Sequence, residues 1–95
     1  MKKKKQTLRD RIADDYPDTK LLFMTQPEYD SAIVGVADGL GIQNNPKVVY
    51  DYDKVIKVNV KMGMTYEDAV EYFDYNQAGA YLGVHTPIFI KQYKT

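Results

Sequence analysis

The feature that most constrains the fold is the stretch of residues 63–87, which carries the signals of a complete helix and of the strand that follows it. Thr65 and Asp68 have the spacing of a capping box, in which the first side chain accepts a hydrogen bond from the backbone N–H three residues on. Gly83 suits the left-handed position beyond the end of this helix, and Pro87 suits the first position of the next strand.

The same helix is amphipathic, because apolar and acidic side chains recur at intervals of three and four residues on opposite faces. We expect the apolar face to pack against another layer of the fold and the acidic face to meet solvent. The first stripe consists of Tyr66, Ala69, Val70, Phe73, Gln77 and Ala80, and the second of Glu67, Glu71 and Asp74.

Apolar segments earlier in the chain, at residues 21–24, 32–37 and 47–50, predict strands. Residues 32–37 are apolar without alternation. This fits a strand buried on both faces, or one covered by helices on one side and pressed against a partner on the other. Ahead of these segments, Thr7 can cap a short helix that Pro17 brings to an end.

Residues 52–62 support two interpretations. β-Branched residues alternate with polar ones here, which is typical of a half-buried strand. The same segment also places apolar side chains on one face of a helix that Asp51 or Asp53 could cap. These residues alone favour the strand and leave the helix open.

Charge is divided unevenly along the chain, although the formal net charge of the 95 residues is zero. Lys2, Lys3, Lys4 and Lys5 are four of the 13 basic residues, so the rest has nine basic against 13 acidic residues, a net charge of about −4. Such a body lacks the positive field of a nucleic-acid-binding domain. We expect no nucleic-acid partner beyond contact of the lysine run with phosphate, and a solvated tail is the simpler interpretation.

The sequence contains no segment that suits a membrane. No apolar run approaches the roughly 20 residues of a membrane-spanning helix. No apolar stretch follows the initial lysines, as it would in a secretory signal. We therefore expect a soluble cytoplasmic protein with no membrane partner.

The residue types also argue against most catalytic and metal sites. The chain has no cysteine, and His85 is its only histidine, so a zinc site would have to consist almost wholly of carboxylates. Gly39 and Gly41 begin a dinucleotide-binding pattern that Asn44 interrupts, and Ser31 is the only serine. We expect no catalytic residue, no metal and no cofactor, and interpret the protein as a non-enzyme.

Seven residues remain candidates for a binding site. Asn76 is expected to carry its amide on the core side of the long helix, where a polar group must find partners. It either pins the last helical turn, which is the favoured interpretation, or lines a ligand pocket with Tyr29 and Asp30. His85 could act as a base near neutral pH, although a lone histidine in a turn is more often incidental. The other candidates are the acidic residues Glu67, Glu71 and Asp74.

Five motifs follow one another along the chain: YDSAIVG at residues 29–35, VYD at 49–51, GMTYEDAVEYFDYN at 63–76, GAYLG at 79–83 and TP at 86–87. In this order they resemble the pattern of a widespread group of small phage-encoded proteins of unknown function. The resemblance does not cover the chain up to Thr25, and it implies a phage setting without a mechanism. It also implies that residues 53–62 form a helix, because the segment before G-M-T reads as a helix in such relatives.

Together these observations predict an α+β fold, in a single domain over residues 7–95 that follows a basic, disordered tail over residues 1–6. We expect a small, mainly antiparallel sheet of three to four strands, a helical pair packed on one face and a short N-terminal helix. A last strand over residues 86–90 would return beside an earlier one.

Three functional hypotheses follow. The first is a phage-encoded inhibitory or binding protein that contacts a host defence or regulatory protein in the host cytoplasm, since the nine tyrosines suit contact surfaces. The second is a domain that binds a small molecule or nucleotide through Tyr29, Asp30, Asn76 and the loop at Gly39. The third is an acidic mimic of DNA. A homodimer stays open in each case.

Overall fold

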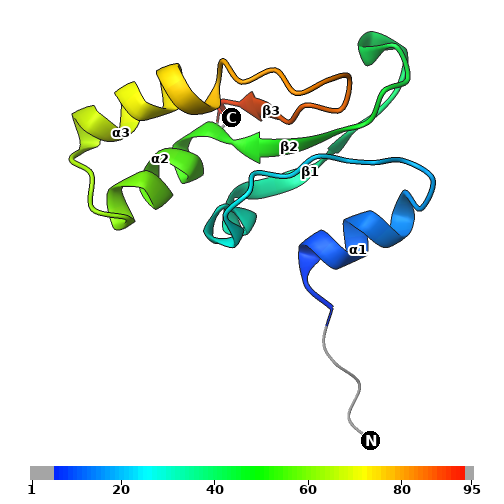
Figure 1. Cartoon of the computed structure of the whole chain (residues 1–95), viewed down its shortest axis with the longest axis horizontal. Helices are drawn as coiled ribbons and strands as arrows, with labels where there is room; N and C mark the ends of the chain where they lie inside the picture. The colour runs from blue at the N-terminus through cyan, green and yellow to red at the C-terminus, as the bar shows by residue number, and fades with distance from the viewer. Residues whose placement is uncertain (1–5, 94–95) are drawn as a thin grey trace, which may run out of the picture.

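The computed structural model describes residues 6–93 and shows an α+β architecture, which confirms the predicted fold class (Figure 1). The predictions for the lysine run and for residues 94–95 lie outside the described residues. The helices are α1 (Leu8–Asp15), α2 (Tyr52–Lys61) and α3 (Tyr66–Tyr72), with short 3-10 helices η1 (Pro27–Ala32) and η2 (Leu40–Ile42) and a π-helical turn η3 (Phe73–Gln77); the strands are β1 (Ile33–Ala37), β2 (Lys47–Asp51) and β3 (Ile88–Ile90).

The described strands form one mixed sheet in the order β1-β2-β3. β1 runs antiparallel to β2, and β3 returns to lie parallel to β2 on its other side. A β-bulge at Val34 shifts the register between Ile33 and Gly35, so this strand does not alternate cleanly. The predicted return of the last strand beside an earlier one is confirmed.

The strand predicted at residues 21–24 is absent from the sheet. Within this segment, side chains rather than a strand ladder bind both backbone groups of Met24. The Met24 N–H donates to the Tyr50 hydroxyl at 2.8 Å, and the Met24 carbonyl accepts from the Arg9 guanidinium at 2.9 Å. The described sheet therefore has three strands, the lower of the two numbers expected.

Residues 52–61 form a helix, so the strand interpretation is wrong and the helix implied by the resemblance is confirmed. The Asp51 carboxylate caps α2 by accepting from the Lys54 N–H at 3.0 Å. One face of the helix enters the core, because Val55, Ile56, Val58 and Asn59 are buried. Gly63, at φ 111°, occupies the left-handed conformation that ends the helix without steric cost.

The helix predicted from Thr65 is confirmed at its start and ends earlier than expected. The Thr65 hydroxyl accepts from the Asp68 N–H at 3.1 Å. After Tyr72 the helix widens into η3, where the Ala78 N–H donates to the Phe73 carbonyl at 2.7 Å. Gly83 does have a positive φ of 119°, but it belongs to the later turn before β3 rather than to the helix end.

The N-terminal helix is also confirmed, with a complete capping box between Thr7 and Asp10. α1 is tied to the body by Arg9, whose guanidinium binds the Asp30 carboxylate at 2.6 Å and lies 4.7 Å from the centre of the Phe23 ring. The buried core that joins sheet and helices comprises Ile12, Tyr29, Ala32, Ile33, Val48, Tyr50, Val55, Ile56, Val58, Ala69 and Phe73.

No helix among residues 6–93 combines the length and the apolar character needed to cross a bilayer.

Candidate functional site

A buried polar network lies where η1, α2, α3 and η3 meet. The Tyr29 hydroxyl donates to the Asn59 Oδ1 at 2.5 Å, and Tyr29 is only 3% exposed. The Asn59 Nδ2 donates to the Gln77 Oε1 at 3.0 Å and to the Ala69 carbonyl at 3.3 Å. Because Asn59 is fully buried, each of these bonds replaces water that the amide lost on folding. The network thereby holds α2, α3 and η3 against η1.

Sequence reasoning did not single out Asn59. The signal that could have found it is its position on the apolar face of residues 52–62 in the helical interpretation. A lone amide on such a face has to find partners inside the protein.

The two buried tyrosines, Tyr29 and Tyr50, have phenol groups that resist ionisation. Burial raises the pKa of Tyr29, and the hydrogen bond with Gln77 offsets only part of this effect. Burial likewise raises the pKa of Tyr50, against a smaller opposing effect of the hydrogen bond from the Met24 backbone. Both hydroxyls therefore remain protonated through the neutral range and serve as structural hydrogen-bonding groups.

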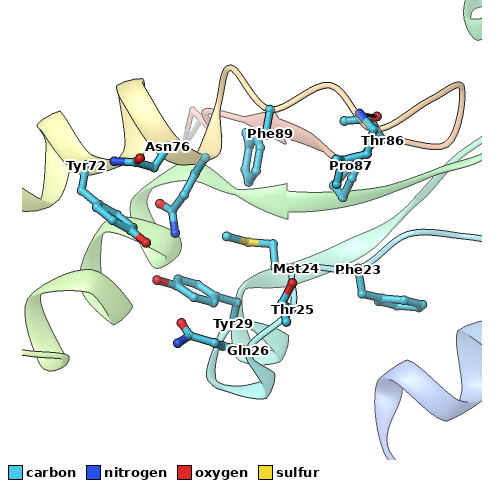
Figure 2. Close-up of a pocket in the computed structure, with 13 residues that line it drawn as sticks. Phe23, Met24, Thr25, Gln26, Tyr29, Tyr72, Asn76, Thr86, Pro87 and Phe89 are labelled. Carbon is cyan, nitrogen blue, oxygen red and sulfur yellow. Dashed lines mark hydrogen bonds between the residues drawn. The ribbon is translucent and has the colours of Figure 1, made fainter.

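A cavity of about 320 Å³ opens beside this network (Figure 2). Residues 23–26 form one wall, the ends of α3 and η3 form another, and the segment that leads into β3 closes the third. Its lining is Phe23, Met24, Thr25, Gln26, Tyr29, Tyr72, Asn76, Gln77, Ala80, Leu82, Thr86, Pro87 and Phe89.

The structure brings together two of the residues predicted to share a ligand pocket and leaves the third apart. Tyr29 and Asn76 both line the cavity. Asp30 lies outside the lining and is paired with Arg9 instead. Asn76 is exposed, so the expectation that its amide faces the core is wrong; the neighbouring Gln77, which shares a helical face with Phe73, turns inward and binds Asn59.

His85 and the loop at Gly39 have local structural contacts away from this cavity. The His85 Nδ1 lies 2.8 Å from the Pro46 carbonyl, which can only accept, so the ring donates from this nitrogen. The nearby Lys47 ammonium donates to the Val84 carbonyl. At Gly39, the backbone N–H donates to the Asp38 carboxylate at 2.8 Å within a turn.

The outer side of α3 and η3 forms a second candidate site, here named the tyrosine–carboxylate surface. Tyr66 and Tyr75 are 66% and 79% exposed and flank the acidic stripe. With Tyr52 and Val70, these residues line a shallow hollow of about 720 Å³. The tyrosine–carboxylate surface consists of Tyr66, Glu67, Glu71, Asp74 and Tyr75.

The carboxylates of this surface have no basic partner within the described part of the chain. Among residues 6–93, the ion pair found within 4.0 Å is that of Arg9 with Asp30. Lys91 lines a neighbouring hollow together with Asp74, and its ammonium lies 4.7 Å from the centre of the Tyr52 ring rather than on a carboxylate. The surface thus presents uncompensated negative charge between two aromatic side chains.

Some carboxylates elsewhere are engaged in the fold, such as that of Asp51. Asp51 caps α2 and also accepts from the Gln92 amide at 3.3 Å. Over residues 6–93, no three histidine, aspartate or glutamate side chains converge as metal ligands would.

Comparison with known proteins found no matching family model, no matching curated protein and no matching solved structure.

Proposed function

We propose that the chain is a small phage-encoded binding protein that acts by protein–protein contact on a host defence or regulatory protein in the host cytoplasm. The tyrosine–carboxylate surface is its contact surface. The phage setting and the location depend on the motif resemblance, and the mode of action depends on the surface itself.

The observation that carries the proposal is the exposure of Tyr66 and Tyr75 beside three unpaired carboxylates, Glu67, Glu71 and Asp74. Tyrosine supplies a large contact area with few rotatable bonds, and it is enriched among the residues that contribute most to binding. Neither ring takes part in the buried core. The exposed area is therefore free to be covered by a partner at no cost to the fold.

The charge of the surface indicates the chemistry of the partner. Three carboxylates on one helix face favour a partner surface rich in lysine or arginine, because complementary charge speeds encounter and fixes orientation. The hypothesis of an acidic DNA mimic depends on the same carboxylates, which would stand in for phosphate groups. The tyrosines that flank these carboxylates, Tyr66 and Tyr75, favour a mixed aromatic and ionic contact over a purely electrostatic one, since a phosphate backbone offers no equivalent of an exposed ring.

Affinity capture from host lysate tests the proposal with a matched pair of variants. Tyr75→Ala removes a ring of the tyrosine–carboxylate surface, and Tyr81→Ala removes a ring of similar exposure, 74%, outside it. We expect one host protein to be retained by the natural chain and by Tyr81→Ala, and lost with Tyr75→Ala.

Three results would count against the proposal. Failure to retain any specific protein would remove protein contact as the function. Equal retention by both variants would place the contact elsewhere on the molecule. Binding that disappears entirely at high salt, with no effect of Tyr75→Ala, would favour the acidic mimic instead.

A further inference from the structure

The cavity next to the polar network has walls that suit a flat ring. Tyr72 and Tyr29 reach toward it from α3 and η1, and Phe89 lines it from β3 (Figure 2). Met24 and Pro87 complete its apolar surface, while the ring of Phe23 turns away toward α1. Its volume of about 320 Å³ falls at the lower end of the range for sites of small organic ligands.

The polar groups of the lining divide into engaged and available ones. The Thr86 hydroxyl donates to the Gly83 carbonyl and accepts from the Leu82 N–H, both at 2.7 Å, so it has no donor left for a ligand. Gln77 is engaged with Asn59. By contrast, no hydrogen bond within residues 6–93 involves the side-chain amides of Gln26 and Asn76.

The side-chain amides of Gln26 and Asn76 determine which hydrogen-bonding groups of a ligand the cavity can recognise. Asparagine and glutamine side chains each offer an N–H donor beside a carbonyl acceptor. This pair matches the adjacent acceptor and donor on the edge of a nucleobase, as in amide recognition of adenine. Aromatic rings contribute the stacking surface that every base can use.

The lining also lacks formal charge. None of its side chains is a lysine, arginine, histidine, aspartate or glutamate. Phosphate and carboxylate groups are normally held by charge-assisted hydrogen bonds from basic side chains. The cavity therefore suits an uncharged ligand, because an anionic group would find no basic side chain in its lining.

We propose that this cavity is a binding site for a neutral heteroaromatic molecule of nucleobase or nucleoside type. The ring packs against Tyr72 and Phe89, and the Asn76 and Gln26 amides bind its edge. No residue of the cavity lining belongs to the tyrosine–carboxylate surface. The proposed ligand, an uncharged base or nucleoside, is a narrower class than the small molecule or nucleotide of the second hypothesis.

Adenosine is the probe for the first test, with guanosine and cytidine in parallel titrations of ¹⁵N-labelled protein followed by NMR. We expect saturable shifts at the side-chain amide of Asn76 and at the backbone amides of Tyr72 and Phe89 for at least one nucleoside. The 5′-monophosphate of that nucleoside should bind no more tightly, because the lining offers no cation.

Three variants locate the site. Asn76→Ala removes an exposed amide and should weaken binding about tenfold, the loss of roughly one good hydrogen-bonding contact. Ala80→Phe fills the cavity from an exposed position and should abolish the shifts. Tyr75→Ala, one residue from Asn76 but outside the lining, should bind like the natural chain. The spectrum of each free variant verifies its fold.

The proposal is overturned if no nucleoside gives a saturable shift at millimolar concentration. It is also overturned if the shifts persist unchanged in Ala80→Phe, since the ligand would then sit elsewhere. Tighter binding of the monophosphate than of the nucleoside would contradict the neutral character of the site.

Discussion

Buried and exposed tyrosines of this chain are put to opposite uses. Tyr29 and Tyr50 are 3% and 0% exposed, and each hydroxyl is engaged with a partner inside the protein. Tyr66 and Tyr75 leave most of their surface in solvent and lie outside the core. A tyrosine that stabilises this fold is therefore recognised by a hydrogen-bond partner of its hydroxyl inside the protein. A tyrosine whose ring is exposed and outside the core is free to contact another molecule.

The buried pair connects segments that strand pairing does not reach. Tyr29 links η1 to α2 through Asn59, and Tyr50 holds residues 21–24 through the Met24 N–H. A phenol removed from water must keep its hydrogen bond, since an orphaned buried polar group costs about 1–3 kcal/mol. These tyrosines should therefore contribute to the free energy of unfolding, and the exposed pair should not.

The largest effect is expected when the buried network loses its centre. Asn59→Leu leaves the Tyr29 hydroxyl, the Gln77 amide and the Ala69 carbonyl without their partner. We expect a loss of about 2–4 kcal/mol in the free energy of unfolding, measured by urea denaturation. Asn76→Ala, an exposed amide, is the control and should stay within about 0.5 kcal/mol of the natural chain. Equal effects of the two variants would mean that Asn59 is not the centre of a network.

A smaller loss is expected when one hydroxyl is removed without disturbing the packing of its ring. Tyr50→Phe keeps the aromatic contact with Phe89 and leaves the Met24 N–H without its acceptor. The free energy of unfolding should fall by about 1–3 kcal/mol, and the Met24 amide should exchange its hydrogen faster. Tyr66→Phe is the matched control and should change neither quantity; unaltered exchange at Met24 in Tyr50→Phe would contradict the anchoring of residues 21–24.

The two groups of tyrosines should also differ in their response to alkali. Burial raises the pKa of Tyr29 and Tyr50 in the folded state above the ordinary value of about 10. Their contribution to stability is then complete below that ordinary value and is lost as the pH rises through the folded-state pKa. Urea denaturation at increasing pH should show stability declining above about pH 10, with a shallower decline in Tyr29→Phe. A decline of equal slope in Tyr29→Phe would show that this phenol does not contribute.

The smallest effect on stability is expected at the exposed pair. Tyr66→Ala and Tyr75→Ala should each change the free energy of unfolding by no more than about 0.5 kcal/mol, because neither ring is part of the core. Thermal or urea unfolding measures this directly. A loss of more than 1 kcal/mol, by the same scale, would assign these rings to the fold and weaken the case for a contact surface.

Local signals predicted the parts of this fold that depend on neighbouring residues. Thr7 and Thr65 act as caps in the structure, as their spacing to the next aspartate indicated. Residues 52–61 were ambiguous because β-branched side chains alternate there. The cap at Asp51 is a local signal that favours the helix, whereas the burial of one helical face depends on the tertiary structure.

The misses involve long-range contacts. The apolar run at residues 21–24 resembles a strand, but its partners are Tyr50 and Arg9, which the sequence separates widely from it. The cavity lining contains both Tyr29 and Asn76, which corresponds to the less favoured of the two interpretations of Asn76, while Asp30 is held by Arg9 from another helix. Which of two adjacent amides turns inward, Asn76 or Gln77, is decided by the position of Asn59.

The most direct measurement replaces single tyrosines with a photo-crosslinking phenylalanine derivative and irradiates host cells that express the protein. With the crosslinker at position 75, in the tyrosine–carboxylate surface, we predict a covalent adduct to one host protein. With the crosslinker at position 81, equally exposed but outside that surface, we predict none. No adduct at position 75, or the same adducts at both positions, would contradict the proposed contact surface.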